Sequence, residues 1–175
     1  EEIAKFEDVE LTVMVPPVWL DSAGPVELER AHTNGYRLLV SPIRLNGQFH
    51  SYYFPQLAKH MAAIQPDIVH IDEEPYNLAT WLAWRQARQK GAKSLFFSWQ
   101  NLDKQYPFPF RQMEKQVLAG VDYAIMGNME AGQVWQKKGY VGPQRVIPQF
   151  GVDPDLFCPP ARRDEGRGFI IGAAN

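Results

Sequence analysis

The hydrophobic positions along the chain form short runs of strand length that alternate with stretches of helical period. Apolar runs predict β-strands at residues 9–15, 37–40, 68–71, 94–97, 123–126, 145–147 and 169–171. Between them, apolar spacings of three and four predict helices at 50–65, 76–90, 110–121 and 128–139. The stretch 16–36 contains the turn signals Gly24-Pro25 and Asn34-Gly35 and matches neither period, so it receives no assignment.

This order of elements predicts an α/β fold. Apolar strands separated by helices are typical of a mostly parallel sheet with helices on both faces. We therefore expect a Rossmann-like domain over residues 1–158. Residues 159–166 are proline-led and then charged, as linkers tend to be, so 159–175 would hold a linker and the start of a second domain.

Composition and charge exclude several classes of protein. The chain has 175 residues with a net charge of -2, which argues against nucleic-acid binding through bulk electrostatics. Its single cysteine, Cys158, excludes an internal disulfide and a cysteine-rich metal site, and it fits a reducing compartment such as the cytoplasm. No apolar run approaches the roughly 18 residues of a membrane span. No motif supports a metal site or a bound cofactor.

The two ends of the chain predict a fragment. Residue 1 is Glu rather than Met, and residues 1–6 resemble the tail of an amphipathic helix. The segment VIPQFGVDPDLFCPP, residues 146–160, runs from a predicted strand through a turn into a double proline, and only fifteen residues follow it. We interpret the chain as part of a longer protein.

Polar and aromatic residues follow directly after several predicted strands. In an open parallel sheet, ligands bind beyond the carboxyl ends of the strands, so we expect a binding site at that edge. The first group of candidate site residues comprises His50, Asp72, Glu73, Glu74, Trp99, Gln100 and Asn101. A second group comprises Asn128, Gln149, Gly151, Val152 and Asp153.

Each group of residues has a structural interpretation beside the functional one. The three consecutive carboxylates at 72–74 either complement a helix dipole or accept hydrogen bonds from sugar hydroxyls, one of them serving as a general base. Trp99 with its two following amides is either a half-buried aromatic or a platform for a sugar ring. His50 either contacts ligand or caps a helix. His70, inside an apolar strand, is expected in the core.

Three stretches together resemble the N-terminal domain of a family 4 glycosyltransferase with the two-domain GT-B architecture. They are PDIVHIDEEPYNLATW (66–81), FFSWQNLDKQYPFPFRQMEKQVLAGVDYAIMGNMEAGQVWQKKGY (96–140) and VIPQFGVDPDLFCP (146–159). The third stretch resembles the family signature vIPnGVD…F.P that precedes the linker, with Gln149-Phe150 in place of the usual Asn-Gly. Trp99-Gln100-Asn101 departs from the family, which often has a histidine there.

The resemblance implies a retaining transferase that moves a sugar from a nucleotide-sugar donor to a sugar, lipid-linked or polyol acceptor. The first group of residues would then bind the acceptor, and the second would face the donor and the interdomain region. The domain would lack its first strand, and its partners would be the two substrates and its own C-terminal domain. Family members often work at the inner face of the membrane, so peripheral membrane contact stays open. Because the donor-binding domain is missing, we expect the fragment alone to be inactive.

Two alternatives remain open at this point. A nucleotide-sugar epimerase shares the GT-B architecture without needing an acceptor. A non-catalytic Rossmann-like binding module would use the same sheet edge with no transfer chemistry.

Overall fold

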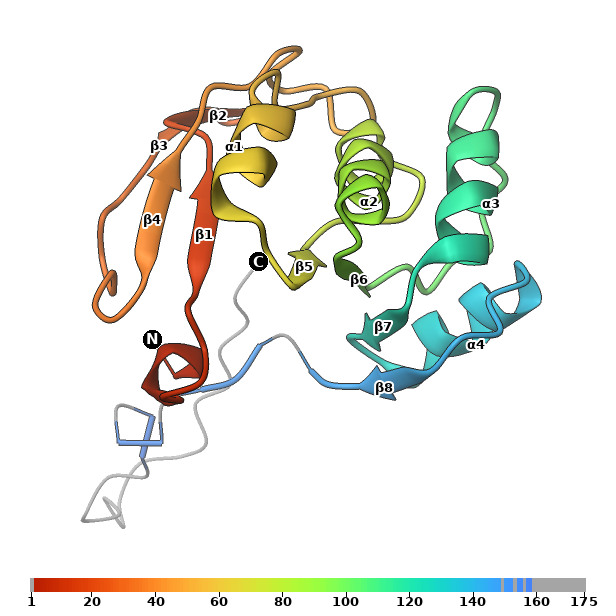
Figure 1. Ribbon diagram of the computed structural model, residues 1–175. Helices are drawn as coiled ribbons and strands as arrows, with labels where there is room; N and C mark the ends of the chain where they lie inside the picture. Colours follow the sequence, from red (N-terminus) through yellow and green to blue (C-terminus); the bar gives the residue numbers. More distant parts are fainter. Residues whose placement is uncertain (1, 149, 153, 156, 159–175) are drawn as a thin grey trace, which may run out of the picture.

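The computed structural model describes residues 2–148, 150–152, 154–155 and 157–158, and it confirms the α/β, Rossmann-like fold (Figure 1). Four parallel strands form the largest sheet, in the order β5-β6-β7-β8. These strands are β5 (Ile68–Ile71), β6 (Lys93–Ser98), β7 (Tyr123–Met126) and β8 (Gln144–Val146). Each is hydrogen-bonded to the next strand along the chain, so every connection is a crossover that includes a helix.

Three helices connect these strands and pack on the sheet. They are α2 (Leu78–Lys90), α3 (Phe110–Gly120) and α4 (Met129–Lys137). Helix α1 (Leu57–Ile64) comes directly before β5, and a short 3-10 helix η1 (Ile3–Lys5) lies near the start of the chain. Phe96 of β6 and Trp135 of α4 are fully buried in one core together with Val117 of α3. The apolar spacing that predicted α3 is thus the face that it buries.

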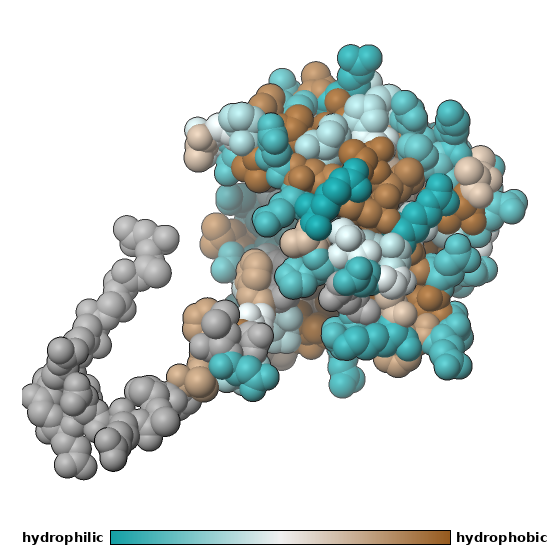
Figure 2. Space-filling view, turned by 90° about the vertical axis from the view of Figure 1, so that its left-hand side faces the viewer, coloured by the Kyte–Doolittle hydropathy of each residue, from teal (hydrophilic) through white to brown (hydrophobic). Residues whose placement is uncertain are grey.

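The N-terminal part of the chain forms two further, two-stranded sheets. The strands β1 (Thr12–Val15) and β4 (Arg37–Val40) pair in parallel. The strands β2 (Val18–Asp21) and β3 (Gly24–Glu27) form an antiparallel hairpin within the stretch that hydrophobic periodicity left unassigned. Its burial pattern is mostly exposed, so few apolar positions were available to indicate strands. Figure 2 shows this side of the molecule, where hydrophobic groups lie among hydrophilic ones.

The sheet of β1 and β4 lies beside β5 (Figure 1). Met14 of β1 and Val69 of β5 pack against the same core cluster, which α1 and α2 contribute. Among the described residues, β1 pairs only with β4 and β5 pairs only with β6. Each of the two strands therefore has one edge whose backbone groups have no strand partner in the described part of the chain.

Two predictions from the sequence are corrected. Helix α1 begins at Leu57 rather than at His50, because the backbone of Tyr53 is paired with Arg44 in an isolated bridge and cannot join a helix. His70 does not lie in the core: in β5 the side chains of Ile68 and His70 are exposed, whereas Ile71 is buried. Strand side chains alternate between faces, and the face that carries His70 is open among the described residues.

The remaining predicted elements lie within a few residues of those observed. Strand β1 starts at Thr12 rather than at residue 9, and β8 covers 144–146 rather than 145–147. Gly91 ends α2 in the left-handed conformation, as its position in the sequence predicts. The predicted strand at 169–171 and the predicted linker at 159–166 lie outside the described residues.

Candidate functional site

The candidate site is built at the carboxyl ends of β5, β6 and β7. The loop after β5 carries Asp72, Glu73 and Glu74, and the loop after β6 carries Trp99, Gln100 and Asn101. The structure joins these two loops directly, because Glu74 bonds across to Ser98 and to the backbone of Trp99. We define the edge site as these two loops together with His50, Tyr76 and Asn77.

Glu74 is held by a network of donors. Its Oε2 accepts a hydrogen bond from Ser98 Oγ at 2.6 Å, and its Oε1 accepts from the Trp99 backbone N–H at 2.9 Å. Ser98 Oγ accepts in turn from Trp135 Nε1 at 2.6 Å and from the Gln100 N–H at 3.1 Å. With both acceptor positions of the hydroxyl filled, its own proton must point at Glu74, which fixes the direction of every bond in the network.

Burial raises the pKa of the Glu74 carboxyl from its ordinary value of 4.5 to about 7, although the bonds from Ser98 and from the Trp99 N–H oppose the rise. Desolvation therefore outweighs two hydrogen bonds to the charged form. The carboxyl is close to half protonated at neutral pH. A carboxyl with such a pKa at the carboxyl edge of a parallel sheet has the properties expected of a functional site.

Glu73 points in another direction and anchors a second network. Its Oε1 accepts from Tyr52 Oη and its Oε2 accepts from Asn77 Nδ2, both at 2.6 Å. Asn77 Oδ1 lies 3.0 Å from His50 Nδ1. Because the Asn77 amide nitrogen donates to Glu73, its oxygen is the acceptor and His50 Nδ1 is the donor. The neutral His50 ring therefore carries its proton on Nδ1 and offers Nε2 as an acceptor.

Asn77 occupies the N-cap position of α2, yet its side chain makes no capping bond. Asn is among the best N-cap residues, and Asn128 at the start of α4 shows the expected behaviour by accepting from the Ala131 N–H at 2.7 Å. Asn77 is 3% exposed, and its amide nitrogen donates to Glu73 while its amide oxygen accepts from His50. Its side chain thus orients His50 instead of stabilising the helix end.

Aromatic rings surround His50. Tyr76, Tyr106 and Phe110 have ring centroids 5.3, 5.7 and 5.7 Å from the His50 ring. Tyr76 and Tyr106 are stacked on each other at 3.9 Å, and Tyr76 Oη lies 3.5 Å from Gln100 Oε1, the outer limit of a hydrogen bond. These contacts place His50 and the loop after β6 in the same site.

A buried ion pair between Lys138 and Glu114 lies against the ring of Tyr106. Lys138 Nζ lies 2.7 Å from Glu114 Oε2, and both side chains are almost fully buried. The same ammonium lies 5.0 Å from the centre of the Tyr106 ring and 4.9 Å from that of Trp135. Lys138 therefore connects α3, α4 and the loop that carries Tyr106.

Trp99 presents a partly exposed aromatic surface at the edge of the site. Its side chain is 38% exposed, and its ring lies 5.8 Å from that of Phe150 at an interplanar angle of 33°. The indole lies directly over Gly127: a Cβ on that residue would be 2.5 Å from the ring. Glycine at this position lets the tryptophan lie close against the end of β7.

The other candidates are placed less closely. Asp72 and Asn101 are exposed at the same edge. Asn128 caps α4 at the carboxyl end of β7, and Gly151 and Val152 are exposed beyond β8. Gln149 and Asp153 lie outside the described residues. The structure thus connects five residues of the first group through hydrogen bonds and ring contacts, namely His50, Glu73, Glu74, Trp99 and Gln100. It shows no comparable network among the described residues of the second group.

Several residues of the edge site were not singled out from the sequence. Tyr52, Asn77, Ser98, Tyr106 and Trp135 complete its networks. Asn77 could have been noticed because it follows three carboxylates at a helix start. Tyr52 and Tyr106 come from irregular segments, so neither hydrophobic periodicity nor strand ends indicate them.

None of the described helices is long and apolar enough to cross a membrane. The described residues contain no group of three or more His, Cys, Asp or Glu side chains placed to hold a metal ion. Comparison with family models, with curated proteins and with solved structures gave no match.

Proposed function

We propose that this chain is the acceptor-side domain of a retaining, two-domain glycosyltransferase, which moves a sugar from a nucleotide-sugar to a sugar, lipid-linked or polyol acceptor. The observation that carries the proposal is the edge site. Carboxylates, amides, a histidine and an open aromatic face converge there, at the end of the sheet where α/β domains bind ligands.

The edge site has the chemistry to hold a polyhydroxylated ring. The exposed face of Trp99 can stack on the apolar face of a sugar, while neighbouring polar groups receive its hydroxyls. His50 Nε2 is an acceptor, and the hydrogen bond from His50 Nδ1 to Asn77 orients the ring that carries it. Glu73 and Glu74 have two donors each within the protein, so in this proposal they position His50 and the loop after β6 instead of gripping the acceptor.

The transfer step divides the work between two domains. The bond from the sugar C1 to the diphosphate oxygen breaks, and a bond from C1 to the acceptor oxygen forms on the same face. The nucleoside diphosphate leaves, and the proton of the acceptor hydroxyl passes to the released diphosphate oxygen. The proposed role of this domain is to hold that hydroxyl, with His50 Nε2 as its hydrogen-bond partner. The second domain would hold the nucleotide.

The open edges of β1 and β5 support the expected domain organisation. Strand β1 runs parallel to β4, and strand β5 runs parallel to β6. Met14 of β1 and Val69 of β5 pack on the same core cluster. One more parallel strand between them would join the two sheets into the continuous sheet of a Rossmann-like domain. In this proposal, the first strand that the resemblance implies would fill this place.

Action in the cytoplasm, at the inner face of the membrane, belongs to the same proposal. The single cysteine, Cys158, is exposed and unpaired, which fits a reducing compartment. The lipid-linked acceptors of similar enzymes supply the reason to place the protein at the membrane surface.

A transfer assay with the intact protein tests the proposal. Purified full-length protein is offered a panel of nucleotide-sugars with and without glycoside and polyol acceptors, and release of nucleotide is followed. We expect acceptor-dependent release, with Trp99→Ala and His50→Ala raising the KM for the acceptor. Val141→Ala, a change at a 95% exposed position, serves as the control.

The outcomes separate the three interpretations. Nucleotide release or sugar isomerisation that ignores every acceptor would support an epimerase. If the protein turns over none of the nucleotide-sugars, the result would support a non-catalytic binding module. Transfer that is indifferent to both Trp99→Ala and His50→Ala would show that the acceptor lies elsewhere.

A further inference from the structure

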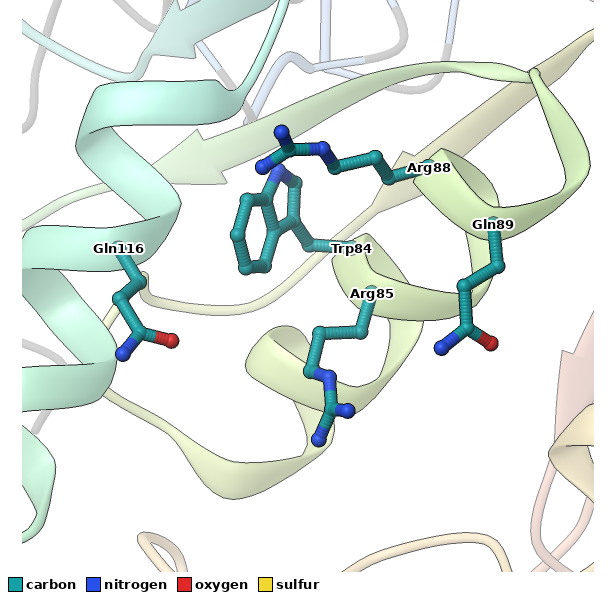
Figure 3. Close-up of a pocket in the computed structure, with 5 residues that line it drawn as sticks. All are labelled: Trp84, Arg85, Arg88, Gln89 and Gln116. Atoms are coloured by element: carbon teal, nitrogen blue, oxygen red, sulfur yellow. The ribbon is translucent and has the colours of Figure 1, made fainter.

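A second candidate site lies on the outer side of α2 and α3. It is a pocket of about 360 Å³ lined by Trp84, Arg85, Arg88, Gln89 and Gln116. Figure 3 shows the first four residues projecting from α2 and Gln116 facing them from α3. Trp84, Arg85 and Arg88 stand about two to three turns after the start of α2, whereas the edge site adjoins that start. The pocket is therefore distinct from the edge site.

The pocket contains a buried donor that lacks a partner. Trp84 is 5% exposed, and its Nε1–H makes no hydrogen bond within the described part of the chain. Buried indole N–H groups are normally hydrogen-bonded, so an orphan in a pocket wall requires an explanation. Figure 3 shows the Arg88 side chain lying along the nitrogen-bearing edge of the indole. Arg88 offers only donors, so it cannot satisfy this N–H, and the nitrogen itself is sealed from solvent. The Trp84 N–H is therefore a close neighbour of Arg88 but not a donor to a ligand in the pocket.

The two arginines have no carboxylate partner among the described residues, and no acidic residue lines the pocket. Arg85 lies 4.5 Å above the Trp81 ring, and Arg88 lies 5.8 Å from the centre of the Trp84 ring, along its edge. Because neither guanidinium is paired with a described carboxylate, both keep N–H groups for a ligand. Gln116 Oε1 already accepts from Trp81 Nε1 at 2.8 Å. What Gln116 can still offer a ligand is its amide N–H.

We propose that this pocket binds a phosphate group, with Arg85 and Arg88 supplying charge and the Gln116 amide N–H donating to one phosphate oxygen. Two guanidinium forks and a neutral N–H match the several acceptor oxygens of a tetrahedral dianion. A free phosphate ester and a lipid phosphate headgroup share this chemistry. The site does not depend on the function proposed for the edge site.

Nuclear magnetic resonance provides a direct test. The chain has five tryptophans, so its indole N–H region is simple, and the spectrum of Trp84→Phe assigns the Trp84 signal by its disappearance. Titration with inorganic phosphate at constant ionic strength should shift the Trp84 Nε1–H signal. Arg85→Gln and Arg88→Gln should each weaken binding by about tenfold or more, because each removes a charged hydrogen bond. Arg111→Gln, which removes an exposed charge from α3 outside the pocket, should leave the affinity unchanged.

Vesicles distinguish the source of the phosphate. Sedimentation with phosphatidylcholine vesicles is compared with and without phosphatidic acid, using the same three variants. A shift with inorganic phosphate supports a soluble phosphate ligand. Binding only to phosphatidic acid, lost in Arg85→Gln and Arg88→Gln but not in Arg111→Gln, supports a headgroup. No response to either probe, or equal losses in all three variants, would overturn the proposal.

Discussion

Replacing Glu74 with Gln should remove a specific part of the pH dependence of stability. The folded state holds this carboxyl with a pKa of about 7, whereas the ordinary value is 4.5. Between these two values the folded protein binds more protons than the unfolded chain, so stability falls as pH rises. The contribution is therefore present at low pH and is lost as pH rises through about 7.

The magnitude follows from the size of the pKa rise. Full ionisation of the buried Glu74 costs about 3 kcal/mol relative to an exposed glutamate. Between about pH 5 and about pH 8, the wild type should lose about 2.5 kcal/mol of unfolding free energy through this group. Glu74→Gln cannot ionise, so the difference between its stabilities at the two pH values should be smaller by that amount. Its absolute stability will also reflect the changed bond to Ser98, so the pH difference is the informative quantity.

Urea denaturation at both pH values measures this difference. All other ionisable groups are the same in both proteins, so their contribution cancels when wild type and variant are compared. Glu130→Gln, which removes an exposed carboxylate from the first turn of α4, is the matched control and should follow the wild type. If Glu74→Gln keeps the full wild-type pH dependence, the carboxyl is not held in the desolvated state described above.

Three further changes test the packing around the edge site. Gly127→Ala should displace the Trp99 indole, because its Cβ would lie 2.5 Å from the ring, and the Trp99 indole N–H resonance should shift. Gly132→Ala, whose Cβ would come no closer than 3.5 Å to a neighbour, should leave that resonance in place. Asn128→Ala should lower the unfolding free energy by about 1 kcal/mol through loss of the α4 cap, and an equal loss from Asn101→Ala would contradict that explanation. Lys138→Met should lower the unfolding free energy by about 3–5 kcal/mol, because it leaves the Glu114 carboxylate buried without its partner. Urea denaturation should show that adding Glu114→Leu restores part of this loss, and a double variant no more stable than Lys138→Met would refute the explanation.

The sequence predicted the regular part of the fold well, because most elements bury one clear face. The stripe that contains Val117 and Leu118 defines α3, and Phe96 marks a strand that packs against the core helices. The hairpin of β2 and β3 was not predicted because most of its positions are exposed. The side chain of Asn46 also bonds to the backbone of Val18 and Leu20. A contact across some 26 residues leaves no local pattern.

The location of the edge site could be predicted, but its internal arrangement could not. Strand ends indicated the loops that carry Glu74 and Trp99. The different tasks of Glu73 and Glu74 depend on which side chains lie opposite, namely Tyr52 and Asn77 for one and Ser98 for the other. Three adjacent carboxylates look equivalent in a sequence, and only their three-dimensional neighbours distinguish them.

The stereochemistry of sugar transfer by the intact protein tests the central claim most directly. Proton NMR of the reaction, recorded while a nucleotide-sugar donor is consumed in the presence of acceptor, reports the anomeric configuration of the first product formed. We expect a new glycosidic bond with the configuration of the donor, and loss of that product when the donor-binding domain is removed. An inverted product, or consumption of the nucleotide-sugar to an epimer with no glycosidic bond to the acceptor, would contradict it.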